Sequence, residues 1–257
     1  MFDFHIHTTV SFDGRDDAEA MLAAAEQAGL AEICFTDHID YTPEMDMVFD
    51  TAVYRAAYDN LRSDKLLIRR GMEYGLTPDN QGQLTEDLKR YDFDFVLGSV
   101  HLVQGLDVYL EPYWENRTAE QAVELFLEQT LACVEVHGDY DVLGHLTYIS
   151  KCRGNPTKAL IRYEDHKAIF DQILRELVRR EKGLEVNTSG VDRCGGYLPT
   201  LDFVQRFHNL GGRIVTIGSD AHDTGRVGQY SHRLTRELKE IFGYVCTFEQ
   251  RKPIFHK

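Results

Sequence analysis

The sequence predicts an α/β protein in which parallel strands alternate with helices. Short apolar runs of β-type residues recur seven times along the 257 residues, and amphipathic helical segments lie between them. Right-handed crossovers between such units either wind an open sheet doubly or close it into a barrel. Seven units favour a barrel-like closure, and a chain of this length is sufficient for one such domain.

The individual elements follow from local patterns. A helix is predicted over 16–29 (DDAEAMLAAAEQAG), with acids in its first turn and Gly29 as its stop, and another over 164–183, which ends in cations and Gly183. Two short β-like runs around 251–253 indicate a terminal hairpin. The seven strand candidates are Phe2–His7, Glu32–Thr36, Leu66–Glu73, Phe95–His101, Val142–Leu146, Leu184–Asn187 and Arg213–Ser219.

Composition excludes several classes of protein. The net charge of −14 opposes binding to nucleic acid. No apolar run is long enough for a membrane span, and the first residues lack the pattern of a signal peptide, so we expect a cytoplasmic protein that does not associate with membranes. The cysteines are odd in number and contain no C-x-x-C pair, which favours reduced thiols over disulfides or a thiolate zinc site; they are Cys34, Cys133, Cys152, Cys194 and Cys246.

Polar residues are concentrated where the predicted strands end. The segments HIH, FTDH, GMEYG, GSVH, LGHL, EVNTSG and GSDAH each close one apolar run. In parallel α/β barrels the carboxyl ends of the strands surround the active site. Side chains that are far apart in the sequence are therefore predicted to converge on one mouth.

These strand-end residues have the chemistry of metal ligands. His5 and His7 are two residues apart on a strand, so they face the same side and can share one ion. A mixture of imidazoles and carboxylates without cysteine is typical of zinc, iron or manganese sites that take part in catalysis. Other residues of these types also lie at the ends of predicted strands; they are His38, Glu73, His101, His145, Asp220 and His222.

The motifs resemble those of the polymerase and histidinol phosphatase (PHP) superfamily, and within it the histidinol-phosphate phosphatases. FHIH with SFDG is similar to the first family motif, FTDH to the second, LGH to the third and GSDAH to the fourth. GMEYG, LGSVHLV and EVNTSG are further similar segments, so the resemblance extends over nearly the whole chain. It implies one domain over residues 1–257 with a distorted (β/α)7 barrel of the PHP type.

The resemblance also implies three divalent metal ions, of zinc, iron or manganese. The first ion would be held by His5, His7, Glu73 and Asp220, and Glu73 would bridge to the second. The second would be held by His101 and His145 as well, and the third by Asp13, His38 and His222. The implied ligands are thus His5, His7, Asp13, His38, Glu73, His101, His145, Asp220 and His222.

A phosphomonoesterase that hydrolyses L-histidinol phosphate, in histidine biosynthesis, is the activity that the resemblance implies. Three divalent ions, three carboxylate ligands and one hydroxide would leave a charge of about +2 at the mouth, which attracts phosphate in spite of the acidic surface. Such ions can generate the attacking hydroxide near neutral pH. The alternatives are a PHP phosphoesterase for nucleotides, phosphotyrosine or oligonucleotides, a non-catalytic metal-binding module, and a metal-dependent amidohydrolase.

Further residues are candidates for binding and catalysis. Asp3 and Asp37 flank ligands and are candidates either to hydrogen-bond an imidazole or to cap a turn or a helix. Asn187 and Ser189 follow the sixth strand and are candidates for substrate contacts. A guanidinium suits a phosphate, and Arg153, Arg193 and Arg162 all remain open for that role. We assign Asp37, Glu73 and His222 as catalytic candidates, and Asp40, Glu44 and Asp192 as candidates for binding the substrate amine.

Overall fold

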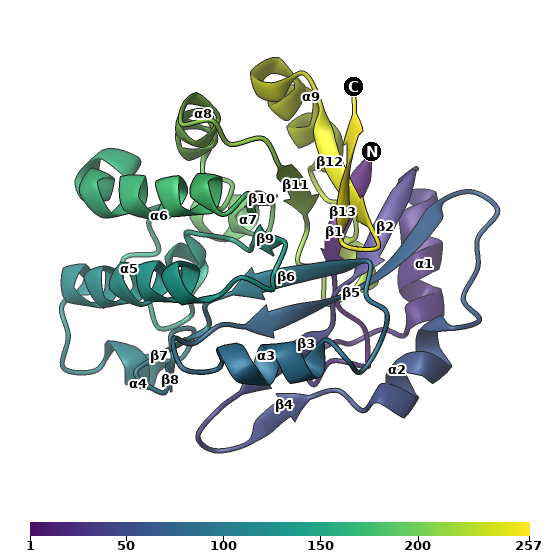
Figure 1. Ribbon diagram of the computed structural model, residues 1–257, viewed down its shortest axis with the longest axis horizontal. Helices are drawn as coiled ribbons and strands as arrows, with labels where there is room; N and C mark the ends of the chain where they lie inside the picture. The colour runs from purple at the N-terminus through teal and green to yellow at the C-terminus, as the bar shows by residue number, and fades with distance from the viewer.

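Seven parallel strands form a nearly closed barrel in the computed structural model, which describes residues 1–257 (Figure 1). Each of them falls within or overlaps a predicted strand, so the predicted fold class is confirmed. The order around the barrel is the order in the chain, as right-handed βα units require. The strands are β1 (Phe2–Ile6), β2 (Glu32–Phe35), β5 (Leu67–Gly75), β6 (Phe95–Ser99), β9 (Val142–Leu143), β10 (Gly183–Asn187) and β11 (Val215–Gly218).

The barrel closes where the chain after β11 meets β1. Ile6 and Ala221 form a parallel bridge, and the amide of His7 donates to the carbonyl of Ala221 at 2.9 Å. The carboxylate of Asp3 accepts from the backbone amides of Ser219 at 2.9 Å and of Gly228 at 2.8 Å. Closure therefore places the HIH and GSDAH motifs side by side.

Strand β5 is unusually long and explains the distortion of the barrel. Its first half pairs with β2, from Leu67 opposite Glu32 to Arg70 opposite Phe35. Its second half pairs with β3 (His38–Tyr41), which begins after a break at Thr36 and Asp37 and runs in the same direction as β2. Strand β4 (Asp46–Val48) then pairs with β3 in the antiparallel direction. The sequence interpretation did not include these two short strands, nor the hairpin of β7 (Leu102–Val103) and β8 (Leu106–Asp107).

The helices lie outside the strands (Figure 1). Helix α1 (Ala18–Gln27) begins at Asp17, whose carboxylate accepts from the amide of Ala20, and Gly29 follows it with a left-handed φ of 68°, as predicted. The other α-helices are α2 (Thr51–Tyr58), α3 (Gln81–Asp87), α4 (Glu111–Trp114), α5 (Ala119–Val136), α6 (Lys167–Arg179), α7 (Gly190–Cys194), α8 (Leu201–Asn209) and α9 (Ser231–Phe242); the 3-10 helices are η1 (Tyr148–Lys151), η2 (Tyr163–His166) and η3 (Thr224–Arg226).

The prediction that Gly183 stops a helix is wrong. Helix α6 ends at Arg179, and the left-handed residue after it is Glu181, with a φ of 56°. Gly183 is instead the first residue of β10, where a Cβ atom would lie only 2.6 Å from Ile214 and 2.7 Å from Val142. Close packing between neighbouring strands therefore accounts for this glycine.

The terminal hairpin is present and covers the end of the barrel opposite to the strand-end motifs. Strands β12 (Val245–Glu249) and β13 (Lys252–His256) pair in the antiparallel direction. At their turn the amide of Arg251 donates to the carbonyl of Asp94, and its guanidinium pairs with Asp141, so the turn lies at the starts of β6 and β9. The two termini lie near one another (Figure 1). All five cysteines are free, and no helix combines the length and apolar character needed to cross a membrane.

Candidate metal centre

His5 and His7 project from the carboxyl end of β1 into the barrel. The residue between them, Ile6, is fixed on both sides by pairing with Phe35 and bridging to Ala221. Both imidazoles are completely buried, and their Nε2 atoms lie 3.0 Å apart. The two-residue period of a strand thus directs both rings to one point.

Glu73 occupies the middle of the strand-end cluster. Its Oε2 atom lies 3.2 Å from Nε2 of His5 and 3.4 Å from Nε2 of His7. Its Oε1 atom lies 2.9 Å from Nε2 of His145 and 3.4 Å from Nε2 of His101. A carboxylate that presents one oxygen to each of two imidazole pairs has the geometry of a ligand that bridges two cations.

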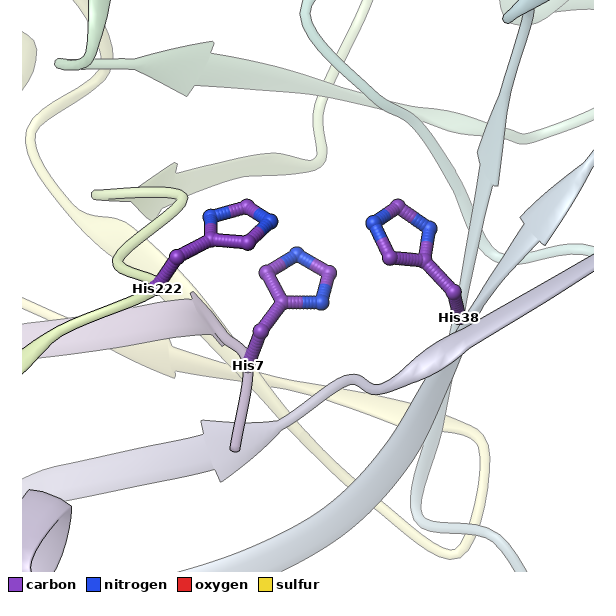
Figure 2. A group of neighbouring side chains, drawn as sticks. All are labelled: His7, His38 and His222. Carbon is purple, nitrogen blue, oxygen red and sulfur yellow. The ribbon is translucent and has the colours of Figure 1, made fainter. Parts of the chain in front are cut away.

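A third group of donors lies at the outer side of the cluster. His7, His38 and His222 extend from three separate segments of the chain and point toward one another, with nitrogen atoms within 4.8 Å (Figure 2). Asp13 approaches the same group, with its Oδ2 atom 3.0 Å from Nε2 of His222 and its Oδ1 atom 3.8 Å from Nε2 of His38. The structure therefore brings together all members of the third implied ligand set.

Asp220 completes the cluster from the loop after β11. Its Oδ1 atom lies 3.7 Å from Nε2 of His5 and 3.5 Å from Nε2 of His7. The residue has a left-handed φ of 55°, a conformation that aspartate tolerates better than most side chains. Its amide donates to the carbonyl of His5 at 2.8 Å, so barrel closure also holds this carboxylate in place.

Two buried carboxylates hold the ligand imidazoles from behind. Glu185 lies 2.7 Å from Nδ1 of His5 through Oε1 and accepts from the backbone amide of His145 through Oε2, also at 2.7 Å. Asp40 lies 2.9 Å from Nδ1 of His101 and 3.0 Å from Nδ1 of His38. A bond on one ring nitrogen fixes the tautomer and leaves the other nitrogen free to bind a cation.

Neither Asp3 nor Asp37 hydrogen-bonds an imidazole. Asp3 accepts from backbone amides at the barrel closure, and burial raises its pKa to about 6. Asp37 accepts from the amide of Thr8 at 2.8 Å and from the hydroxyl of Ser11 at 2.9 Å. Ser11 in turn lies 3.3 Å from Nδ1 of His7. The carboxylate of Asp37 is therefore linked to the imidazole of His7 through Ser11.

The charge state of the cluster fits divalent cations. Burial alone would raise the pKa of Glu73, but the imidazoles of His5, His101 and His38 hold it well below its usual range. Burial, together with the His222 and His38 rings, holds the pKa of His7 well below its usual range. Against the effect of burial, the neighbouring carboxylates raise the pKa of His5, His38 and His101, so bound cations would replace the protons of these rings. We conclude that nitrogen and oxygen donors, arranged in several groups of three, provide a suitable binding set for such ions.

The cluster lies at the bottom of a cavity of about 820 Å3. Arg193 lines this cavity, and its guanidinium donates to the hydroxyl of Tyr109 at 3.0 Å. Ser189 lines it too and accepts from Nζ of Lys151 at 2.8 Å. Asn187 lies behind Ser189, fully buried, with its amide nitrogen 3.2 Å from Glu185.

The two other candidate arginines do not line the cavity. Arg153 is 68% exposed and lies 3.5 Å from Glu111, whereas Arg162 is 74% exposed and pairs with Asp165. The remaining histidines also lie away from the cavity; they are His137, His166, His208, His232 and His256.

Sequence reasoning missed Lys151 and Glu185. Nζ of Lys151 is buried at the cavity wall, where it contacts the carboxylate of Asp220. Lys151 closely follows the LGHL motif, and Glu185 lies within EVNTSG, next to residues that were singled out. An ionisable residue inside an otherwise apolar strand was the available signal for Glu185.

We expect Glu185→Gln to reduce metal affinity or turnover by about 10- to 100-fold without unfolding the protein. The glutamine amide can still accept from His145, but it cannot both keep that bond and accept from Nδ1 of His5. Metal content per chain and kcat would be measured. The control is Glu32→Gln, which removes a buried carboxylate paired with Arg69 at the start of β2. Equal metal loss in both variants would contradict a specific role for Glu185.

Comparison with known proteins identifies related sequences and structures. Residues 3–189 match the family model described as PHP domain. A probable histidinol-phosphatase of Clostridium acetobutylicum is 34% identical over 233 residues, which are 89% of each chain. A histidinol-phosphatase of Lactococcus lactis is 30% identical over 97% of this chain and 95% of its own.

A solved structure extends this likeness to three dimensions. The histidinol phosphate phosphatase of Lactococcus lactis, in complex with zinc, L-histidinol and phosphate, superposes with a TM-score of 0.86. The sequence identity is 28%, and the match covers 98% of both chains.

Proposed function

Because the chain belongs to the PHP family, we propose that it is a metal-dependent phosphatase that hydrolyses L-histidinol phosphate to L-histidinol and phosphate. The named activity of its relatives and the zinc, histidinol and phosphate in the similar structure support this substrate. One continuous core that includes residues from Phe2 to Phe248 supports a single domain over residues 1–257. We place the reaction in the cytoplasm, where the free cysteines would remain reduced.

The position of Glu73 is the observation that carries the proposal. Its two oxygens face two different imidazole pairs at the bottom of an open cavity, which is the arrangement of a polynuclear centre that substrate can reach. Three ions of zinc, iron or manganese would occupy the donor groups around Glu73. When bound, they would supply activated water near neutral pH and positive charge for the phosphoryl oxygens.

Other side chains at the cavity would bind the phosphate or hold neighbouring groups in position. Arg193 and Lys151 bring positive charge to the wall of the cavity, where they would hold and orient the phosphate. Ser189 fixes the position of the lysine amine. His222 is 26% exposed and is a catalytic candidate because it faces the cavity beside the ligands. Asp37, which lies behind Ser11, is a positioning residue.

The test is a comparison of phosphate release from several compounds by the metal-loaded protein. The panel consists of L-histidinol phosphate, p-nitrophenyl phosphate, phosphotyrosine, a nucleoside 3′,5′-bisphosphate and single-stranded DNA. We expect the highest kcat/KM for histidinol phosphate and no cleavage of DNA. A preference for the bisphosphate or DNA would replace the proposed substrate, and release from none of the compounds would exclude the phosphatase.

We expect Arg193→Met to lower kcat for phosphate release by about tenfold or more, because a guanidinium on the transferring phosphoryl group acts in the transition state. Arg153→Met is the matched control, since Arg153 lies in the chain at a comparable distance after a strand end but outside the cavity. Steady-state rates of both variants would be measured on protein of equal metal content. A larger loss of kcat in Arg153→Met would reverse the assignment.

A further inference from the structure

Most acidic side chains on the cavity wall already have partners. Asp223 accepts from the amide of Gly225 at 3.1 Å and lies 3.5 Å from the guanidinium of Arg15. Asp40 is held between two imidazoles, so it is not free for the substrate amine, as was expected of it. Asp192 does not line the cavity and accepts from Gln229 and Tyr230. The acids that line it are Asp13, Asp40, Glu44, Glu73, Asp107, Asp220 and Asp223.

Asp107 is different because it has no cationic partner. The one hydrogen bond to its carboxylate comes from the amide of Tyr109, which donates to Oδ1 at 2.8 Å. No lysine, arginine or histidine nitrogen pairs with its other oxygen, although the residue is half-buried and burial raises its pKa. Glu44 also lacks a partner, but it is exposed to solvent in the turn between β3 and β4. A half-buried carboxylate without an ion-pair partner is a favourable contact for a cation on a ligand.

The backbone ties Asp107 to the metal centre. Asp107 pairs with Leu102 across the β7–β8 hairpin, which directly follows His101. The amide of Val108 donates to the carbonyl of His101 at 3.0 Å. Asp107 therefore lines the same cavity as His101 and Glu73, on a hairpin that is fixed to the backbone of His101.

The same wall carries the opposite charge. Tyr109, two residues after Asp107, accepts from the guanidinium of Arg193 at 3.0 Å. Arg193 and Asp107 do not pair with each other, so both remain available to a ligand. A molecule with an anion and a cation a few bonds apart would be complementary to this wall.

We infer that Asp107 binds the ammonium group of the substrate and so determines the preference for amino-alkyl phosphate esters over simple ones. This inference rests on the proposed function. In histidinol phosphate the amine is on the second carbon from the ester oxygen. With the phosphate over the metal centre, the ammonium group is thus near enough to reach a carboxylate next to His101.

The test compares Asp107→Asn with wild type on two substrates, L-histidinol phosphate and p-nitrophenyl phosphate, which has no amine. Asparagine keeps the shape and can still accept from the amide of Tyr109, so the hairpin should be preserved. We expect KM for histidinol phosphate to rise by roughly 10- to 100-fold with little change in kcat. Values for p-nitrophenyl phosphate and the metal content should stay within about twofold of wild type. Inhibition of p-nitrophenyl phosphate hydrolysis by L-histidinol should weaken in parallel.

Glu111→Gln is the matched control, because it removes an exposed carboxylate that closely follows Asp107 in the chain but lies outside the cavity, and it should leave both substrates unaffected. Asp107→Glu, which keeps the charge, should restore part of the selectivity. If Asp107→Asn kept wild-type selectivity, or lost both substrates equally, the role of Asp107 would be overturned while the phosphatase remained. If wild type hydrolysed p-nitrophenyl phosphate but neither hydrolysed histidinol phosphate nor bound histidinol, the proposed substrate itself would fail.

Discussion

Glu73→Gln is expected to lower kcat for phosphate release by about a hundredfold or more, which corresponds to about 3 kcal/mol in the activation barrier. The amide has nearly the shape of the carboxylate, so the fold should persist. Its neutral nitrogen cannot bind a cation, and only one oxygen remains to serve both imidazole pairs. Metal analysis and steady-state kinetics on the same preparation would measure the effect.

Glu32→Gln provides the control for Glu73→Gln as well. Glu32 is a buried carboxylate on the neighbouring strand β2, but it pairs with Arg69 at the far end of the barrel. This variant should bind metal and turn over substrate as wild type does, apart from a loss of stability. Normal kcat and unchanged metal content in Glu73→Gln would refute the bridging role.

His7→Ala is expected to be similarly damaging, by orders of magnitude in kcat, because His7 contributes to two donor groups. Its Nε2 atom lies 3.4 Å from Glu73, and its ring also faces His38 and His222 (Figure 2). Bound metal should fall while far-UV circular dichroism stays native, since the packed core lies beneath the ligands.

His137→Ala is the matched control for His7→Ala. His137 is also buried, but it lies at the end of α5, away from the cavity. Its ring bonds to the carbonyl of Thr77. It should change stability without changing metal content or kcat. If His7→Ala retained wild-type metal and rate, His7 would not be a ligand.

The fold was largely predictable because its main signals are local. Each barrel strand is a short apolar run that ends in polar residues, and the rule that parallel strand ends converge is independent of tertiary detail. Strand β3 was missed because only Thr36 and Asp37 separate it from β2, so FTDH was interpreted as one strand end. Its pairing with β5 is a long-range property that periodicity does not reveal.

The roles of supporting residues were less predictable for the same reason. Glu185 lies 180 residues from His5 in sequence, and Lys151 lies 69 residues from Asp220, yet each pair is in contact. Asp40 was expected to face the substrate, whereas the fold places it between His38 and His101. Metal ligands carry a recognisable residue type, but a carboxylate that holds an imidazole is distinguished from a solvent-facing one only by its neighbours.

The arginines illustrate how loops limit prediction. Arg153 and Arg193 both follow strand ends, and nothing in their local sequence separates them. The short helix α7 and the contact with Tyr109 direct Arg193 into the cavity, whereas Arg153 extends toward Glu111 outside it. Loop conformation, which depends on contacts between distant segments, determined the difference.

The most direct measurement is phosphate release from L-histidinol phosphate by one preparation as purified, after chelation, and after reloading with zinc, manganese or iron, with metal content determined for each sample. The proposed function predicts that chelation abolishes release and that reloading restores it, with the rate approaching its maximum as the content approaches three ions per chain. Full release by protein that holds less than one ion per chain, or no release by fully loaded protein, would contradict it.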